Sequence, residues 1–227
     1  MATARQAGTE KGARKVSVME RILIFIKHHF KFLWKIIDLA NGLLFSILFK
    51  SRLEAVLTPV FKELAIPPFL YRRLKVSDTE PLYDLIKSQK VSDLEFFSPH
   101  SFDLKSIKNQ FMNRSFYMMG AFDKEKIVGY FFLRFFANKK CFVGRLIDKD
   151  YRGKGIGFVM NIIMYETAWR MGFRCFSTIS RNNSAIMHAH AKNPTMVVVK
   201  ELQNDYLLVE FVRDTLSSQR IGRMRAT

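Results

Sequence analysis

The sequence is poor in acidic residues, and this shortage narrows the range of functions. Of its 227 residues only 20 are Asp or Glu against 37 Lys or Arg, so the formal net charge is +17. Such a charge favours a polyanionic partner, which would be a nucleic acid, an anionic membrane or a small polyanion. The sequence contains no RNA-recognition signature and no zinc-ligand spacing. Nucleic acid is therefore the weakest of these interpretations, and we expect no metal site.

Cysteine is scarce too, and we do not expect a secretory signal peptide. Cys141 and Cys175 both lie in apolar runs, which indicates buried, reduced thiols in a reducing compartment. Glu20 and Arg21 interrupt the first apolar stretch, and no small-residue cleavage site follows it. We therefore expect a cytoplasmic protein, with attachment to the inner membrane face as an option. The leading segment contains Ala and Arg, so organellar targeting stays open.

An uninterrupted membrane span is also missing. Residues 32–49 barely reach the length that a span requires, and they contain Lys35 and Asp38. A charge at the centre of a span costs about 2.5–3.5 kcal/mol, whereas a large apolar residue returns only about 0.3–0.6 kcal/mol. Gain and cost nearly cancel, so spanning is the weakest of three interpretations of this region.

The other two interpretations treat residues 17–66 as an amphipathic helical segment. Its polar residues form a narrow stripe at steps of three or four: Lys27, Lys31, Lys35, Asp38, Gly42, Ser46 and Lys50. The helix would either lie on an anionic membrane, with Phe30, Trp34 and Phe45 at the boundary, or pack on the rest of the protein or a partner chain. Residues 1–16 and 215–227 are expected to be flexible basic tails.

Residues 67–214 are expected to form one α/β domain. Strands are predicted at residues 71–76, 115–122, 126–136, 140–148, 173–179, 195–202 and 206–212. Helices are predicted at residues 82–90, 102–114, 158–171 and 183–192, with Asp78 as the N-terminal cap of the first. The predicted meander at residues 115–148 and the hairpin at residues 195–212 favour an α/β (α+β) fold with a mixed, mostly antiparallel sheet flanked by helices.

A glycine-rich turn between a strand and a helix is the most informative motif. Arg152-Gly153-Lys154-Gly155-Ile156-Gly157 follows the apolar run 141–147 and opens the helix at 158–171. Small residues there leave backbone N–H groups unpaired at the positive end of a helix, which suits phosphate. A P-loop would need Ser or Thr after Lys154, and the glycine spacing does not fit a dinucleotide fingerprint.

The turn and its flanks resemble the GCN5-related N-acetyltransferase (GNAT) superfamily. Residues 147–157, Ile-Asp-Lys-Asp-Tyr-Arg-Gly-Lys-Gly-Ile-Gly, are similar to its strand-to-loop signature. Asn182-Asn183-Ser184-Ala185-Ile186 is similar to the start of its next helix. Residues 96–100 and 127–134 are similar to a subgroup found in surface-polysaccharide biosynthesis. The resemblance covers residues 70–213.

This resemblance implies acetyl-coenzyme A as the donor substrate. The pyrophosphate would be held by the backbone of Gly153, Lys154, Gly155, Ile156 and Gly157. Arg152 and Lys154 would add charge there, unless they are simply solvated loop cations. The backbone of Arg145, Leu146 and Ile147 would pair with the pantetheine arm, and Asn182 and Asn183 belong to the same predicted site.

The residues that would move protons depart from the family pattern. Neither residues 141–147 nor 173–179 contain a carboxylate, and Ser177 and Thr178 stand where an acid is common. The tyrosine that often protonates the thiolate is replaced by Ala189 or His190, depending on which asparagine starts the count. We choose His190 as the thiolate acid, with His188 as the neighbouring alternative. Glu95 or His100 would orient or deprotonate the amine.

Together these residues predict an N-acetyltransferase in which an amine attacks the thioester directly, without a covalent enzyme intermediate. The expected acceptor is an amino sugar of surface-polysaccharide synthesis, and a protein or small amine is an alternative. A second alternative is a membrane- or partner-bound module of the same fold with weak or no catalysis. Homo- or hetero-oligomer formation is left open.

Overall fold

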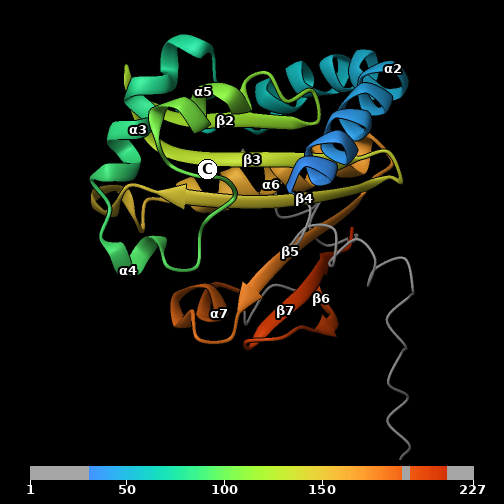
Figure 1. Ribbon diagram of the computed structural model, residues 1–227. Coiled ribbons are helices and arrows are strands. Elements are labelled where there is room, and N and C mark those ends of the chain that lie inside the picture. Colours follow the sequence, from blue (N-terminus) through green and yellow to red (C-terminus); the bar gives the residue numbers. More distant parts are fainter. Residues whose placement is uncertain (1–30, 191–194, 214–227) are drawn as a thin grey trace, which may run out of the picture. The chain divides into compact units, whose positions relative to one another are not determined.

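The computed structural model describes residues 31–190 and 195–213 (Figure 1). The chain divides into two compact units, Met1–Ala40 and Asn41–Thr227. Of the first unit, the described part is residues 31–40, which begin helix α2 (Lys31–Leu64). The described sheet and the remaining described helices belong to the second unit.

Seven strands form one sheet in the second unit. Its order is β1-β2-β3-β4-β5-β7-β6. The strands are β1 (Leu70–Arg73), β2 (Phe116–Asp123), β3 (Lys126–Phe136), β4 (Lys140–Ile147), β5 (Arg174–Ser180), β6 (Met196–Glu201) and β7 (Tyr206–Phe211). All neighbours pair antiparallel except β4 and β5, which pair in parallel. The prediction of a mixed, mostly antiparallel sheet is confirmed.

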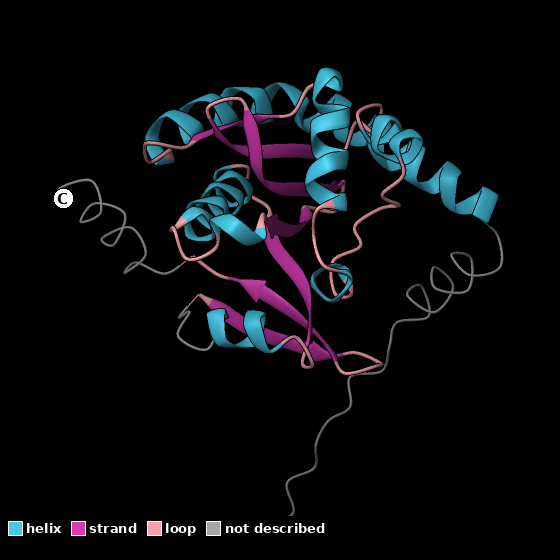
Figure 2. Cartoon of the chain, turned by 90° about the vertical axis from the view of Figure 1, so that its left-hand side faces the viewer, coloured by secondary structure: helices cyan, strands magenta, loops and turns pink. Residues whose placement is uncertain are grey.

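Helices cover both faces of this sheet. They are the 3-10 helices η1 (Val76–Asp78) and η2 (Lys149–Tyr151) and the α-helices α3 (Thr79–Lys87), α4 (Val91–Leu94), α5 (Leu104–Gln110), α6 (Ile156–Arg170) and α7 (Ser184–His190). Figure 1 shows α3 and α5 on one face and α6 on the other, and Figure 2 shows the sheet between them from the side. Strand residues alternate between two cores, so Phe132 packs on the α3 side while Phe131 and Leu133 pack on the α6 side.

From Asn41 onward, α2 contributes its inner face to the core on the α6 side. The buried residues along that face are Phe45, Leu53, Leu57, Val60 and Leu64. The ring of Phe45 stacks on that of Phe135 with centroids 4.8 Å apart. Burial of large apolar side chains is worth roughly 1.5–3 kcal/mol each, so this packing holds the helix on the domain.

Asn41 fixes the same helix through polar contacts at the ends of β2 and β3. Its Nδ2 donates to Ser115 Oγ at 3.1 Å and to the carbonyl oxygen of Phe135 at 3.0 Å. Its Oδ1 accepts the backbone N–H of Ala137 at 2.9 Å. One side chain thus connects α2 to two strands that are far away in the sequence.

One face of residues 41–64 packs on the domain, as the interpretation of packing on the protein itself expects. Phe45 was expected at a membrane boundary and is instead fully buried. Gly42 was expected in a polar stripe and is also buried, and a Cβ there would make only an ordinary contact with Arg114 Cβ at 3.7 Å. Of the expected stripe, Gly42 therefore lies on the inner face, Ser46 is partly buried and Lys50 is exposed. Residues 17–30 and the side chain of Trp34 lie outside the described residues.

The outer face of α2 is apolar as well. Leu43, Leu44, Ile47 and Leu48 expose between 48% and 71% of their surface. Within residues 31–190 and 195–213, no helix is both long enough and apolar enough to cross a membrane.

The first expected helix cap has a different role. Asp78 does precede α3, but its carboxylate makes no side-chain bond to that helix. It accepts two N–H bonds from the guanidinium of Arg72, at 2.7 and 2.9 Å, and the backbone N–H of Lys75 at 2.7 Å. Asp78 therefore ties α3 to strand β1, and the ion pair lowers the pKa of its carboxyl.

Candidate functional site

The glycine turn, Arg152 to Gly157, lies between β4 and α6. Gly153 and Gly155 have φ angles of +79° and +78°, which side chains with a Cβ rarely adopt. Gly155 is the N-terminal cap of α6 and offers no side chain to satisfy the first turn. The conformation of the turn therefore requires glycine at these two positions.

Backbone N–H groups at this turn have no protein acceptor. Within the described part of the chain, none of the six N–H groups from Arg152 to Gly157 donates a hydrogen bond. The first donors of a helix have no partner within it, and the helix dipole places partial positive charge beside them. Such a group of donors fits an anionic ligand with several oxygens, such as a diphosphate.

The base of the turn is held by its own ion pairs and hydrogen bonds. Asp148 directly follows β4, accepts the N–H of Asp150 at 3.1 Å and pairs with Lys126 Nζ at 3.0 Å. The hydroxyl of Tyr151 donates to Asp123 Oδ2 at 2.9 Å. These contacts tie the loop to the hairpin between β2 and β3, so its N–H groups are positioned before any ligand binds.

Next to the turn, β4 loses its pairing with β5. The two strands pair only from Lys140 to Phe142 on β4. Beyond that point the described contact is a side-chain one, in which Ser177 Oγ donates to the carbonyl oxygen of Val143 at 3.1 Å. Residues 143–147, which we call the unpaired edge of β4, thus present backbone groups that an extended ligand could pair with.

The two cations of the turn have nearby protein partners. The guanidinium of Arg152 contacts the carboxylate of Asp93, with Nη1–Oδ1 at 3.2 Å and Nη2–Oδ2 at 2.9 Å. The ammonium of Lys154 lies over the ring of Tyr151, 4.3 Å from its centroid. Arg152 therefore links the glycine turn to α4, and it lowers the pKa of Asp93.

The predicted backbone site on β4 has three different side-chain environments. Arg145 faces α6, where its Nε donates to Asn161 Oδ1 at 2.7 Å. Leu146 is buried on the α3 side, and Ile147 is partly buried against α6. A Cβ on Gly157 would lie 2.8 Å from Ile147 Cδ1 and 2.9 Å from Arg145 Nη1, so glycine here permits close packing of helix and strand.

Downstream of β5, the two asparagines differ in their roles. Asn183 caps α7, since its Oδ1 accepts the N–H of Ile186 at 3.1 Å. Asn182 is exposed, and its N–H donates to Ser180 Oγ at 3.2 Å. His188 is exposed. His190 ends α7, but its side chain lies outside the described part of the structure, as do residues 191–194.

Among the expected amine-binding residues, Glu95 is exposed at the C-terminal end of α4. His100 is in a different position. Its Nδ1 lies 2.8 Å from the carbonyl oxygen of Ser101 and so carries the proton, which leaves Nε2 to accept from the buried Tyr130 hydroxyl at 2.9 Å. Burial lowers the pKa of His100. Both ring nitrogens are in use, so His100 serves the core and is not placed to deprotonate a substrate.

The two cysteines lie opposite each other in the parallel pair of β4 and β5. Cys141 and Cys175 are fully buried and not linked by a disulfide. Burial raises the pKa of both thiols above their ordinary value. They therefore remain protonated at neutral pH and are poor nucleophiles. In the described residues, no group of three or more His, Cys, Asp or Glu side chains is placed to hold a metal ion.

The predicted site residues do not include the two side chains that hold Arg152 and Arg145 in place. Asp93 and Asn161 lie 59 and 16 residues from their arginine partners. The contact between Arg145 and Asn161 is indicated by the sequence pattern. Arg145 alternates with Cys141 and Val143 on the side of β4 that faces the helix, and Asn161 lies one turn after Gly157 on the same face of α6. The contact between Asp93 and Arg152 is not indicated by the pattern.

Solved structures share this fold at low sequence identity. PaiA N-acetyltransferase from Thermoplasma acidophilum, solved with coenzyme A, has a TM-score of 0.55 and 18% identity, covering 64% of this chain and 99% of its own. The GNAT domain of S. lividans PAT has a TM-score of 0.54 and 13% identity, covering 62% and 88%. Ribosomal-protein-S5-alanine acetyltransferase from Vibrio fischeri has a TM-score of 0.53 and 15% identity, covering 66% and 96%.

Comparison of sequences gives the family. No curated protein matches the chain. The profile of the acetyltransferase (GNAT) family matches residues 80–193, just over half of the chain, and this range contains the glycine turn, the unpaired edge of β4 and α7. The chain therefore belongs to the acetyltransferase (GNAT) family.

Proposed function

We propose that the protein is an acetyl-coenzyme A-dependent N-acetyltransferase in which an amine attacks the thioester directly. The observation that carries this proposal is the set of six unpartnered N–H groups at Arg152 to Gly157, next to the unpaired edge of β4. The N–H groups suit the diphosphate of the donor, and the unpaired edge of β4 suits the amide-containing pantetheine arm. Family membership and the similar fold of a coenzyme A complex support the same donor.

In this proposal the chain binds and orients the donor mainly through backbone groups. The N–H groups of Gly153, Lys154, Gly155, Ile156 and Gly157 hold the diphosphate, with Arg152, Lys154 and the asparagines at 182 and 183 beside it. Backbone groups of Arg145, Leu146 and Ile147 pair with the arm. An N–H aimed at the thioester carbonyl would stabilise negative charge as the amine attacks.

Direct attack is supported by the absence of a suitable nucleophile among the described residues. Both thiols are buried and protonated, and Ser177 donates to a backbone carbonyl and contacts no histidine there. Loss of the thiolate then requires a proton, for which His190 is our candidate. Two residues are candidates for positioning the amine. They are Ser177 on β5, which donates to Val143 at the start of the unpaired edge, and Glu95 at the exposed end of α4.

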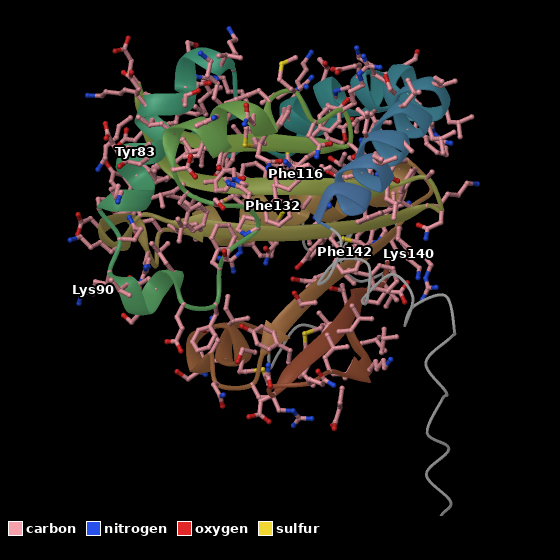
Figure 3. The ribbon with its side chains drawn as sticks, viewed as in Figure 1. Tyr83, Lys90, Phe116, Phe132, Lys140 and Phe142 are labelled. Atoms are coloured by element: carbon pink, nitrogen blue, oxygen red, sulfur yellow. The ribbon has the colours of Figure 1, made fainter. Side chains whose placement is uncertain are left out.

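For the acceptor we propose an amino sugar. The proposal rests on the resemblance of residues 96–100 and 127–134, and one structural feature supports it. Phe97 lies on the α4 side of β4 with its ring 6.2 Å from those of Phe102 and Phe132 and close to Gly144. Figure 3 shows Phe132 beside Phe116 over the middle of the sheet. Phe116 and Phe132 are themselves buried in the core, so Phe97, which is only partly buried, is the ring that we expect to meet the apolar face of a sugar.

A protein N-terminus or a small amine is the alternative acceptor, since the similar structures include a ribosomal-protein acetyltransferase. The second alternative is a module of the same fold with weak or no catalysis. It is favoured by the lack of a carboxylate on residues 141–147 and 173–179. The unpartnered donors of the turn argue against it, because a protein that binds no anion gains nothing from them.

We also propose that the outer face of α2 attaches the protein to an anionic membrane at the inner face. Leu43, Leu44, Ile47 and Leu48 form an exposed apolar patch, and the net charge of +17 complements anionic headgroups. Flotation of the full chain with phosphatidylserine-containing liposomes should fail for Ile47→Glu and persist for Ala55→Glu on the same helix. Equal flotation of both variants, or none by the wild type, would remove the proposal.

Two measurements test the enzymatic proposal. Calorimetric titration with acetyl-coenzyme A should give binding at micromolar concentrations. Release of free thiol is then followed with amino sugars, N-terminal peptides and polyamines. No binding at millimolar donor would exclude the enzyme, and binding without turnover on any amine would favour the module. Turnover on peptides alone would replace the amino sugar by the protein acceptor.

A further inference from the structure

Arg145 places a positive charge at an unexpected point beneath the glycine turn. It lies on the unpaired edge of β4, and its side chain points to α6. The Nε donates to Asn161 Oδ1 at 2.7 Å, which fixes the plane of the guanidinium. Its Nη1 is only 2.9 Å from the point where a Cβ on Gly157 would lie. The free end of the guanidinium is therefore directed at the first turn of α6.

This charge has no carboxylate partner among the described residues. Asn161 supplies a neutral oxygen, and no ion pair involves Arg145 in that part of the chain. The side chain is largely buried, and desolvation lowers the pKa of its guanidinium. The positive end of α6 beside it adds repulsion. A buried cation in such a place is unfavourable unless an anion joins it.

The other arginines around the sheet show how unusual this is. Arg72 is paired with Asp78, Arg170 with Glu63 and Glu166, and Arg174 with Glu210. Each of these three arginines thus has a carboxylate partner within the protein. Arg145 instead approaches Gly157, one of the six residues of the glycine turn whose N–H groups have no acceptor in the described part of the chain.

We propose that the guanidinium of Arg145 is a direct ligand of the donor's diphosphate, acting together with the N–H groups of the glycine turn. This inference rests on the proposed function and adds a side-chain ligand to a site otherwise built from backbone. Asn161 is the positioning residue, because it holds Nε and leaves both Nη groups for the ligand. Gly157 is needed because a side chain there would occupy the space of the guanidinium.

The proposal predicts a specific pattern in binding, which calorimetry can measure with two probes. Coenzyme A carries the diphosphate, whereas pantetheine has the same arm and no phosphate. Arg145→Met should weaken coenzyme A binding about 10- to 100-fold and leave pantetheine binding within about twofold, since a hydrogen bond to a charged group accounts for a change of that size. Asn161→Ala should weaken coenzyme A binding less. Arg73→Met, an exposed arginine on β1, is the matched control and should change neither.

A second readout separates binding from structure. Without ligand, Arg145→Met should unfold at the same or a higher temperature than the wild type, because an unpaired buried charge is removed. Coenzyme A should then raise its melting temperature much less than it raises that of the wild type. If Arg145→Met does not fold, Arg145→Lys replaces it and should keep part of the preference for coenzyme A over pantetheine. If Arg145→Lys loses that preference completely, the proposal stands only when Asn161→Ala also reduces the preference.

Two outcomes overturn the inference. In one, Arg145→Met binds coenzyme A as tightly as the wild type. In the other, it loses affinity for coenzyme A and pantetheine equally, which would show that Arg145 supports the structure of the site and does not bind the diphosphate. A wild type that binds neither coenzyme A nor pantetheine would instead refute the proposed function, so the two failures are distinguishable.

Discussion

Replacing Gly155 by alanine is the sharpest perturbation of the glycine turn, because the chain offers a matched control. Gly155 and Gly172 stand at opposite ends of α6 and have nearly the same backbone angle, φ +78° and +75°. A Cβ on Gly155 would meet nothing within 4 Å, and one on Gly172 would meet only Arg52 Nη2 at 4.0 Å. Neither substitution creates a clash, so each costs only the left-handed backbone conformation, about 1–2 kcal/mol.

The two variants should therefore lose similar free energy of unfolding and differ in binding. Alanine at 155 favours negative φ, which turns the N–H groups of the turn away from a common ligand. Losing one hydrogen bond to a charged group costs about 1.5–3 kcal/mol, or roughly a 10- to 150-fold rise in Kd. Gly172→Ala should leave the Kd unchanged.

Urea unfolding gives the free energies, and calorimetry with acetyl-coenzyme A gives the Kd. The reasoning is refuted if Gly155→Ala binds as tightly as Gly172→Ala, or if both variants lose affinity to the same extent. The first result would remove the turn from the binding site. The second would mean that affinity follows general stability.

Three further substitutions test contacts around the site. Asn41→Ala removes three hydrogen bonds and should lower the free energy of unfolding by about 2–3 kcal/mol in urea with an unchanged Kd for acetyl-coenzyme A; a loss below about 0.5 kcal/mol would mean that this contact does not hold α2. The pKa of Asp78 is lowered by its bonds to Arg72, so its stabilising effect is present above its unfolded pKa near 3.9 and is lost as the pH falls through the lower folded value. Asp78→Asn should thus cost about 1–2 kcal/mol at pH 7 and progressively less in acid, and a pH-independent difference in melting curves would contradict this assignment. Asp93→Asn breaks an exposed ion pair and should change stability by less than about 1 kcal/mol while freeing Arg152 for the donor. Its affinity for acetyl-coenzyme A should rise a few-fold at low salt and match the wild type at high salt, and a fall in affinity would show that Asp93 orients Arg152 instead.

The sheet was predictable where local chemistry determines its turns. The predicted strand at residues 126–136 coincides with β3, because the turns on either side place Lys124 and Lys139 at positive φ, where short connections between antiparallel strands need it. Strand alternation then assigns residues to the two cores without further information. The short helix α4 was not expected, since its apolar residues are too few to form a pattern.

The position of α2 was not predictable from its own sequence. The helix is apolar on both faces, so periodicity cannot say which face is covered. The decision comes from Asn41 meeting Ser115 and Phe45 meeting Phe135, at sequence separations that no local pattern encodes. The same limit applies to the site. The glycine turn is local and was found, whereas the pairing of Arg152 with Asp93 depends on tertiary structure.

The central claim is that the backbone N–H groups from Arg152 to Gly157 bind the diphosphate of the donor. Amide spectra of the ¹⁵N-labelled protein, recorded while coenzyme A is added, test it most directly. The account predicts large downfield shifts for Gly153, Gly155 and Gly157, with Gly172 unmoved, and no such shifts when pantetheine is added. Saturable binding of coenzyme A that leaves the three glycine amides unmoved would contradict it.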